Sequence, residues 1–356
     1  MFRPFAAAAV LLAGTLAEAG PRRHLAPGLA REDDALVVAA PGGDVTIDVA
    51  GWEAVTDPGT ELVVLSRRTG GERQLRVLDR RGKTLGTVTA PNGWTPAATD
   101  DGVVLVPEAL HGPMVPHVLR FLSFDGTLRR EVQEPTLGLL QSRIMRGGRF
   151  VTVSVTGTTD REWTILAYDA SGAELWRHVV AGYPAPEALV TADGQRLVVL
   201  ERDLDASAST ITVLQAGHRP KAHRLPMVAQ LVADPSSARV AAVGERVVAL
   251  IDTESRKLKW QRDDPIDVPL RGGVRFDRRG PRLFVVAAEE DREKKQARLR
   301  LRTYRLSDGA EEREELGDVP ADRLPPVADV EVAPDGGRRV LLHDRAVTAT
   351  PERGTR

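Results

Sequence analysis

The residues with the most evident chemical potential in this sequence are histidines in polar loops. His111 and His117 lie at the two ends of a Gly/Pro-rich segment, and two histidines at that separation could share one metal ion. No Asp or Glu lies between them and the chain has no Cys, so a third ligand would have to come from another loop. His218 and His223 form a similar pair. We interpret both pairs as exposed loop residues and predict no metal site.

The sequence also lacks the common catalytic motifs. It contains no Gly-x-Ser-x-Gly nucleophile turn, no His-Glu-x-x-His zinc motif and no phosphate-binding Gly-x-x-x-x-Gly-Lys loop. Its paired glycines lie between strand-like segments, where they suit turns with positive φ. The Asp-rich turns lack the alternating oxygen ligands of a calcium loop. Motifs therefore predict no catalytic residue.

The composition argues against a nucleic-acid partner. Lys and Arg number 49 and Asp and Glu 50, which leaves a net charge of −1 and no strong field to attract a polyanion. Aromatic residues make up 4% of the chain, too few for a row of stacking platforms along a single strand. Because there is no Cys, no disulfide can form, and burial of apolar side chains must stabilise the fold.

The first residues have the layout of a secretory signal peptide. Arg3 supplies a positive charge, an apolar stretch runs from Phe5 to Leu16, and Ala17-Glu18-Ala19 forms a cleavage triplet. The apolar stretch is shorter than the roughly 20 residues that a transmembrane helix needs. We expect a mature chain that begins near Gly20, is periplasmic or secreted, and does not insert into a membrane after cleavage.

The sequence also contains a weak internal repeat. Short apolar runs rich in Val, Leu and Ile each follow an Asp/Gly turn, and each run leads into a second strand–turn–strand segment. The turns recur about every 41 to 46 residues, with one interval of about 58, which is the spacing of four-stranded propeller blades. The charged stretch Glu289 to Arg298 in the long interval is interpreted as an extended hairpin tip. The runs are Leu62–Leu65, Val103–Val106, Phe150–Val153, Leu197–Leu200, Val240–Val243, Leu283–Val286 and Val340–Leu342.

Two of these units resemble a known repeat. Leu166 to Trp176 contains Asp169, Ser171-Gly172 and a terminal Trp, and Val248 to Trp260 repeats the pattern; this resembles the repeat of PQQ-like propellers. The other units are equally similar to WD40-type and lactonase-type propellers. The resemblance implies a propeller fold, with the two Trp packed between blades. It does not imply the quinone, because quinoprotein dehydrogenases typically have eight blades and often a vicinal Cys pair, so no cofactor is predicted.

We therefore predict an all-β, seven-bladed β-propeller of four-stranded antiparallel blades. A strand from residues 35–49 is expected to complete the C-terminal blade, because an unpaired edge would otherwise remain. The predicted organisation is a signal peptide at 1–19, a linker at 20–34, one propeller domain at 35–352 and a tail at 353–356. We expect a monomer.

A ligand site is predicted where the innermost strands begin. Aligning the units on their turns places seven residues at one position, and a mixture of acids, Arg, Gln and Trp there is typical of a concave polar site. Five of them, Glu187, Arg271, Asp329, Gln141 and Trp52, are the predicted ligand-binding residues, and the first three are expected to share one pocket. We favour a binding or scaffold module for a protein or glycan partner in the cell envelope. The alternative is a propeller lyase, lactonase or quinoprotein-like dehydrogenase with its site at the central channel. The aligned residues are Trp52, Thr95, Gln141, Glu187, Val228, Arg271 and Asp329.

Overall fold

The computed structural model describes residues 23–351, with gaps in the connections between strands, of which the longest is 108–116. All regular secondary structure in these residues is β-strand. No helix that could cross a membrane occurs among them. The predicted signal peptide and the tail at 353–356 lie outside the described residues.

The strands form eight separate antiparallel sheets that follow one another along the chain. The first sheet contains β1 (Arg23–Ala26), β2 (Leu29–Glu32), β3 (Ala35–Val38) and β4 (Val45–Asp48). The second contains β5 (Glu53–Val55), β6 (Val63–Thr69), β7 (Glu72–Leu78) and β8 (Thr84–Ala90). The third contains β9 (Trp94–Ala98), β10 (Gly102–Pro107), β11 (His117–Ser123) and β12 (Leu128–Glu134). The fourth contains β13 (Leu139–Met145), β14 (Arg149–Thr156), β15 (Glu162–Tyr168) and β16 (Glu174–Ala181).

The remaining four sheets continue the same order. The fifth contains β17 (Glu187–Val190), β18 (Arg196–Asp203), β19 (Ala208–Gln215) and β20 (Lys221–Pro226). The sixth contains β21 (Gln230–Ala233), β22 (Arg239–Gly244), β23 (Val247–Asp252) and β24 (Lys257–Arg262). The seventh contains β25 (Val268–Phe276), β26 (Arg282–Asp291), β27 (Gln296–Arg305), β28 (Glu311–Pro320) and the returning β32 (Thr350–Pro351). The eighth contains β29 (Val327–Val332), β30 (Arg338–Leu342) and β31 (Ala346–Thr348).

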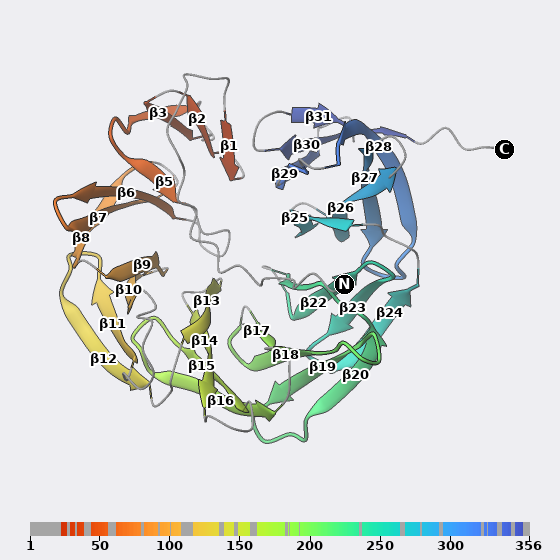
Figure 1. The fold of residues 1–356 in the computed structure, drawn as a ribbon, viewed down its shortest axis with the longest axis horizontal. Coiled ribbons are helices and arrows are strands. Elements are labelled where there is room, and N and C mark those ends of the chain that lie inside the picture. Colours follow the sequence, from red (N-terminus) through yellow and green to blue (C-terminus); the bar gives the residue numbers. More distant parts are fainter. Residues whose placement is uncertain are drawn as a thin grey trace.

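The eight sheets are arranged around a common centre (Figure 1). Within each sheet the strands run up and down in chain order, so every neighbour in a sheet is also a neighbour in sequence, apart from β32. The first strand of a sheet lies toward the centre and the last toward the outside (Figure 1). Consecutive antiparallel sheets set radially around an axis define a β-propeller.

The second strand of each sheet explains why the blades stack. Along β22, Val240 and Ala242 pack into the hydrophobic cluster shared with the preceding sheets, whereas Ala241 and Val243 pack into the cluster shared with the seventh sheet. Successive side chains of a strand point to opposite faces, so a continuous apolar run is what a strand buried on both faces requires. The core is thus a series of layers between neighbouring sheets.

The turns between third and fourth strands depend on Asp and Gly. In the fourth sheet, Asp169 accepts hydrogen bonds from the backbone N–H of Ser171 at 2.8 Å and of Ala173 at 2.9 Å. Gly172 has φ of 83°, and a Cβ there would lie 2.7 Å from the ring of Phe121 in the third sheet. Glycine is needed at this position for both its left-handed backbone and its close approach to the neighbouring blade.

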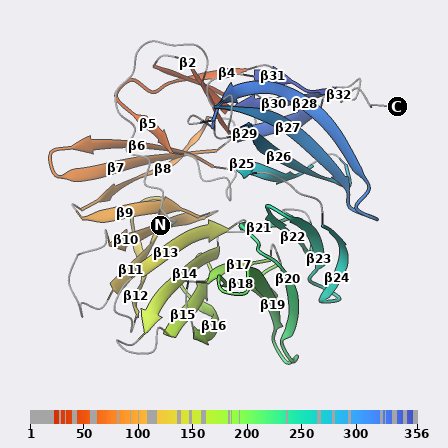
Figure 2. The ribbon, with the colours of Figure 1, turned by 45° about the vertical axis from the view of Figure 1, so that its right-hand side comes forward.

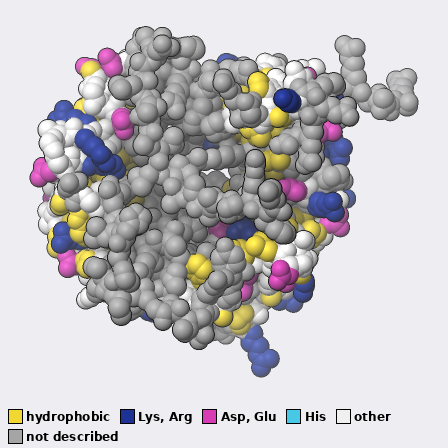
Figure 3. All heavy atoms as spheres, viewed as in Figure 1, with side chains coloured by type: hydrophobic (Ala, Val, Ile, Leu, Met, Phe, Trp, Pro, Cys, Tyr) yellow, Lys and Arg dark blue, Asp and Glu magenta, His cyan; other side chains and the backbone are white. Residues whose placement is uncertain are grey.

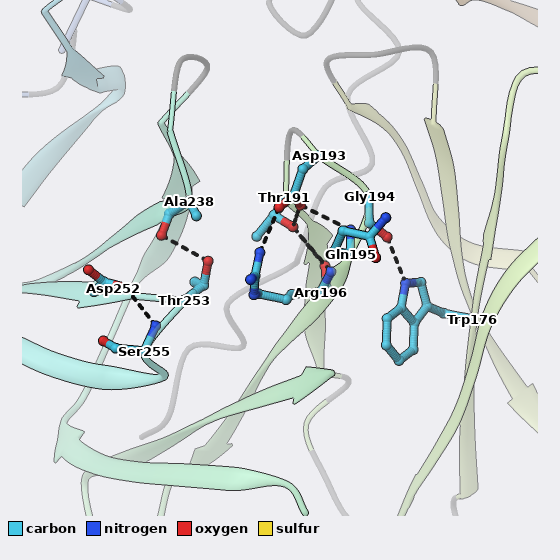
Figure 4. A network of polar contacts seen from close by, with 10 residues as sticks. All are labelled: Trp176, Thr191, Asp193, Gly194, Gln195, Arg196, Ala238, Asp252, Thr253 and Ser255. Atoms are coloured by element: carbon cyan, nitrogen blue, oxygen red, sulfur yellow. Dashed lines mark hydrogen bonds and ion pairs between the residues drawn. The ribbon is translucent and has the colours of Figure 1, made fainter. Parts of the chain in front are cut away.

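The prediction that two tryptophans pack between blades is confirmed. Trp176 on β16 donates its indole N–H to the carbonyl oxygen of Gly194 in the next sheet at 3.2 Å (Figure 4). Trp260 on β24 donates to the carbonyl oxygen of Leu306 in the seventh sheet at 3.1 Å. Each bond links the outer strand of one blade to a turn of the next. The predicted extended hairpin is also present, because β26 pairs with β27 as far as Asp291 and Gln296.

The described residues form eight sheets where the sequence predicted seven blades. The difference arises at the N-terminus, where the predicted linker contains β1 and β2. These strands pair with β3 and β4 to make a complete first sheet, so the segment 35–49 is not shared with the C-terminal blade. The eighth sheet has three strands, and β1 contacts β29 without a shared strand. Instead, β32 extends the seventh sheet by pairing with Glu314 and Glu315 of β28.

Candidate binding site

The up-and-down order of the strands gives the propeller two distinct faces. The first strand of every sheet starts on the same face, and the connections between sheets and the hairpins between second and third strands lie there too. We call this the entry face. The turns between first and second strands and between third and fourth strands lie on the opposite face. Figure 2 shows the β6–β7 hairpin, which belongs to the entry face, reaching the periphery of the molecule.

Several predicted positions are equivalent in the strand pairing. Glu187 pairs with Leu200, Gln141 with Val153 and Thr95 with Val106. In each case the partner is the last residue of the apolar run on the second strand. In the sixth sheet this position is Gln230, which pairs with Val243, rather than Val228, which is buried two residues before it. In these four consecutive sheets the innermost strand therefore carries a polar residue at one level, whereas the equivalent positions in the second and eighth sheets are Ala54 and Val327.

The remaining predicted residues lie on or beside the same inner strands. Trp52 directly precedes β5, and Asp329 pairs with Leu341 in β29. Arg271 lies in a register shift of β25 between Pro269 and Val274. The side chains of Gln141, Arg271 and Asp329 are outside the described residues. That Glu187, Arg271 and Asp329 share one pocket therefore stays a prediction.

The backbones of β25 and β29 come close together at this level. A Cβ on Gly272 would lie 2.5 Å from the carbonyl oxygen of Val327, so the two inner strands touch one residue from Arg271 and two residues from Asp329. Glycine allows this close approach because it has no side chain. The seventh and eighth sheets thus bring the backbones of these two predicted residues to neighbouring positions on adjacent inner strands.

Glu187 takes part in a contact that joins two blades. Its carboxylate accepts a hydrogen bond from the Arg202 guanidinium at 3.0 Å, and their side chains are 12% and 20% exposed. Arg202 also donates to the backbone carbonyl oxygens of Val228 at 2.9 Å and Ala229 at 2.7 Å in the next sheet. This arrangement fixes the fifth sheet against the sixth and shows a structural role for Glu187.

Two tryptophans at the starts of adjacent inner strands carry stacked arginines. The guanidinium of Arg67 lies 4.4 Å from the ring centroid of Trp52, and that of Arg120 lies 4.6 Å from the ring centroid of Trp94. Arg67 is held by Gln74 and Arg120 by Glu131. A guanidinium over an aromatic face is attracted by the ring's negative charge density. Both half-buried tryptophans lie on the entry face.

A surface hollow of about 250 Å³ lies beside Trp94, between the β6–β7 hairpin and the start of β9. Two Arg, one Glu, three Gly, a Pro and the Trp line it. Figure 3 shows basic side chains gathered over this part of the ring, at the left of the view. The sequence alignment of the units selected Trp52 and Thr95. It missed Trp94, although Trp94 is the residue directly before Thr95 in the sequence.

The titratable groups with shifted pKa values are explained by local structure. Burial alone would raise the pKa of Asp169 and of Asp193, but hydrogen bonds within their turns lower both. Burial raises the pKa of Glu201 and lowers that of His178, and neither shift has a second cause. The acids with lowered pKa values therefore lie mainly in turns of the propeller.

The histidine pairs do not meet at a ligand site in the described residues. His111 lies outside them, and His117 is in β11. His218 is exposed, and Nε2 of His223 lies 3.1 Å from the carbonyl oxygen of Arg256. Within the described part of the chain, no group of three or more His, Asp or Glu is arranged to hold a metal ion.

Comparison with known proteins found solved structures of similar shape at low sequence identity. No family model matches the sequence, and no curated protein matches it. The C-terminal WD40 domain of Sif2 has a TM-score of 0.49 at 11% identity, with coverage of 94% of this chain and 92% of that one. A eukaryotic initiation factor has a TM-score of 0.47 at 12% identity, with coverage of 85% and 90%. The dihydro-heme d1 dehydrogenase NirN, in complex with DHE, has a TM-score of 0.47 at 14% identity, with coverage of 95% and 76%.

Proposed function

We propose that this propeller is an exported binding or scaffold module that holds a protein or glycan partner of the cell envelope on its entry face. The observation that carries the proposal is the pair of arginine–tryptophan stacks at the starts of β5 and β9. Trp and Arg are the residue types most enriched at binding hot spots, and here they are presented by adjacent rigid blades.

Rigidity of the surrounding blades supports a binding role. Each consecutive pair of sheets from the first to the eighth is joined by a hydrophobic cluster. Hydrogen bonds from Trp176, Arg202 and Trp260 to neighbouring backbones add further links. A site on such a frame loses little conformational entropy when it binds, because its side chains are already positioned.

The polar residues on the inner strands are less suited to carry the proposal. The Glu187 carboxylate accepts hydrogen bonds from Arg202 of its own sheet and from the backbone N–H of Leu231 in the next sheet. It therefore helps to hold the fifth and sixth sheets together. The enzyme alternative depends on these inner-strand residues, whereas the binding proposal depends on the two arginine–tryptophan stacks. We therefore base the function on the entry face around Trp52 and Trp94.

Binding can be tested with the purified mature chain immobilised on a sensor surface and exposed to a solubilised envelope fraction. We expect reversible binding that protease treatment abolishes if the partner is a protein and periodate abolishes if it is a glycan. The double variant R67Q/R120Q should weaken binding at least tenfold, since truncating an arginine at a binding hot spot costs about 2 kcal/mol or more. Arg177→Gln is the control, because Arg177 is an exposed arginine paired with Glu174 on an outer strand.

Absence of binding to the envelope fraction would contradict the proposal. An equal loss of binding in Arg177→Gln and in the double variant would also contradict it, because the effect would then come from charge rather than from the entry face. Export is tested separately by N-terminal sequencing of the secreted or periplasmic protein, which should begin near Gly20. A sequence that begins at Met1 would contradict export by signal cleavage.

A further inference from the structure

The outer strands of the fifth and sixth sheets carry a concentration of positive charge. Each strand and the turn before it lie entirely within the described residues, as 215–226 and 252–262. The two segments contain seven Lys or Arg residues and two acids, and they hold three of the six lysines in the chain. The corresponding segment of the seventh sheet, 305–320, has two arginines and six acids. We call the seven cations the basic rim: Arg219, Lys221, Arg224, Arg256, Lys257, Lys259 and Arg262.

Two polar contacts hold the fifth and sixth sheets together at the basic rim. The Arg256 guanidinium donates a hydrogen bond to the carbonyl oxygen of Arg219 at 2.9 Å. The carbonyl oxygen of Arg256 lies 3.1 Å from Nε2 of His223 on β20. Lys221 lies between Arg219 and His223 in the chain, and Lys257 directly follows Arg256. The cations of the two sheets are therefore neighbours on one part of the surface.

Much of this charge is not neutralised within the protein. Arg262 donates to the carbonyl oxygens of Gly309 and Asp308 in the seventh sheet. Lys259 interacts electrostatically with Asp252. The other exposed cations of the rim have no hydrogen bond or ion pair of their side chains within the described part of the chain: Arg219, Lys221, Arg224 and Lys257. Like charges repel one another, so an anionic partner would stabilise this arrangement.

Arg256 is held in a backbone conformation that is unfavourable for its residue type. Its φ is 55°, in the left-handed region, where a Cβ costs free energy. Residues held in such conformations are found most often at functional sites. In the corresponding turns of five other sheets the residue with positive φ is a glycine: Gly82, Gly126, Gly172, Gly217 and Gly309. Glycine would suit this turn equally well, so the fold does not require a cation here.

Protection of the sheet edges does not explain the basic rim either. Lysines on an outer strand hinder pairing with the edge of another sheet. However, β16 is eight residues long, against six for β20 and for β24, and it contains one Arg and no Lys. Arg219 and Arg256 lie in turns, outside the strands. The charge is therefore concentrated beyond what edge protection needs.

The chemistry of the basic rim suits an extended acidic segment of a protein. β20 and β24 are the outermost strands of their sheets, so a polypeptide can pair with their backbone groups while its carboxylates meet the cations. The pairing of β32 with β28 shows that an outer strand of this propeller accepts such an addition. A lipid surface is a poorer match, because neither segment exposes a large apolar side chain to insert. A glycan is also a poorer match, because the one aromatic residue of the two segments, Trp260, is buried.

We propose that the basic rim is a second interaction surface, which binds an extended acidic protein segment along β20 and β24. The surface lies at the periphery of the ring, beside the turns of the opposite face, and is separate from the arginine–tryptophan stacks of the entry face. The inference goes beyond the proposed function and does not depend on it.

The test is fluorescence anisotropy of a labelled synthetic peptide of alternating Glu and Thr residues, titrated with the full mature chain. We expect this peptide to bind, and a peptide of alternating Gln and Thr to bind at least tenfold more weakly. High ionic strength should weaken the Glu peptide, because salt screens exposed charges. The triple variant K221Q/R224Q/K257Q should weaken it about eightfold, since each exposed ion pair accounts for about a factor of two. Arg256→Gly should weaken it about twofold and leave the melting temperature unchanged, because glycine adopts a positive φ without strain.

The matched control is K83Q/R130Q/R339Q, which removes the same charge from exposed positions on three other sheets and should bind the Glu peptide as the wild type does. An equal loss in both triple variants would overturn the inference, because the effect would then come from net charge. Equal binding of the Glu and Gln peptides would overturn it as well. Binding of phosphatidylglycerol vesicles or of sodium polygalacturonate, without binding of the Glu peptide, would overturn the assignment to a protein partner.

The inference and the proposed function can fail independently. R67Q/R120Q, which alters the entry face, should bind the Glu peptide as the wild type does. If the Glu peptide does not bind while the envelope fraction still binds, this inference fails and the proposed function stands. Loss of envelope binding with retention of the Glu peptide is the separate failure of the proposed function.

Discussion

Trp176 and Gly194 are eighteen residues apart in the chain and belong to different sheets, yet a single hydrogen bond of 3.2 Å joins them. The indole of Trp176 leaves the outer strand of the fourth sheet and reaches the first turn of the fifth. In that turn Asp193 accepts hydrogen bonds from Thr191 at 2.6 Å and from the guanidinium of Arg196 at 2.6 Å. The turn is therefore rigid, and the tryptophan links two blades through a fixed acceptor (Figure 4).

Replacing Trp176 with Phe tests this link. The variant keeps most of the aromatic surface but leaves the carbonyl oxygen of Gly194 without its donor, so we expect a loss of about 1 kcal/mol in the free energy of unfolding. Urea denaturation at neutral pH measures it. Leu175→Ala, at an exposed neighbouring position, is the control and should change stability by about 0.5 kcal/mol or less. Equal stability of wild type and Trp176→Phe would show that the bond contributes nothing.

The contact that Arg202 makes between the fifth and sixth sheets should contribute more to stability than the Trp176 hydrogen bond. Arg202→Met leaves the largely buried carboxylate of Glu187 without its cation and leaves the carbonyl oxygens of Val228 and Ala229 without their donor. Because removing one partner of a largely buried ion pair is costly, we expect a loss of about 3 kcal/mol in the free energy of unfolding. Arg224→Met, at an exposed position on β20, is the control. A change in Arg202→Met no larger than in the control would remove Glu187 from the joint and return it to the candidate ligand residues.

The turn acids predict a loss of stability in acid. Ser123 and the backbone N–H of Thr127 donate to the Asp125 carboxylate, which lowers its pKa from 3.8 to about 2. A group whose pKa is lower in the folded than in the unfolded state stabilises the fold above the unfolded value, and this stabilisation is lost as the pH falls through the folded value. Between pH 3.8 and about 2, Asp125→Asn should therefore lose less stability than the wild type.

The measurement is the urea midpoint at several pH values across that window. Glu254→Gln, at an exposed turn position, is the control and should follow the wild-type curve. A wild-type midpoint that does not fall between pH 3.8 and about 2, or an Asp125→Asn curve parallel to it, would contradict the assignment of the turn hydrogen bonds.

Much of the fold was predictable because blade interiors have a simple sequence pattern. The apolar runs Val103–Val106 and Leu197–Leu200 lie inside β10 and β18, where both faces of the strand are buried. The first two strands of the first sheet were missed because Arg23–Ala26 and Leu29–Glu32 are four residues long and lack such a run. Strands of that length form because they pair with the neighbouring strands of a sheet, and the local sequence pattern does not indicate that pairing.

The candidate site was predictable only in part, because it depends on strand register and on the packing of neighbouring blades. Alignment on the turns placed Thr95, Gln141 and Glu187 correctly in register, because no extra residue occurs between turn and strand. Arg271 lies in the irregular part of β25, and a register shift has no signature in a single sequence. The hollow combines Arg68 and Trp94 from two sheets, and only blade packing brings them together.

The most direct test of the account is photo-crosslinking in the living cell, with a benzophenone amino acid placed at Glu72 in one variant and at Lys83 in another. Glu72 is exposed on the entry face beside the hollow, and Lys83 is exposed in a turn on the opposite face. We expect a specific adduct with an envelope protein or glycan from position 72 and none from position 83. Adducts from position 83 alone, or none from position 72, would contradict the claim that the entry face is the binding surface.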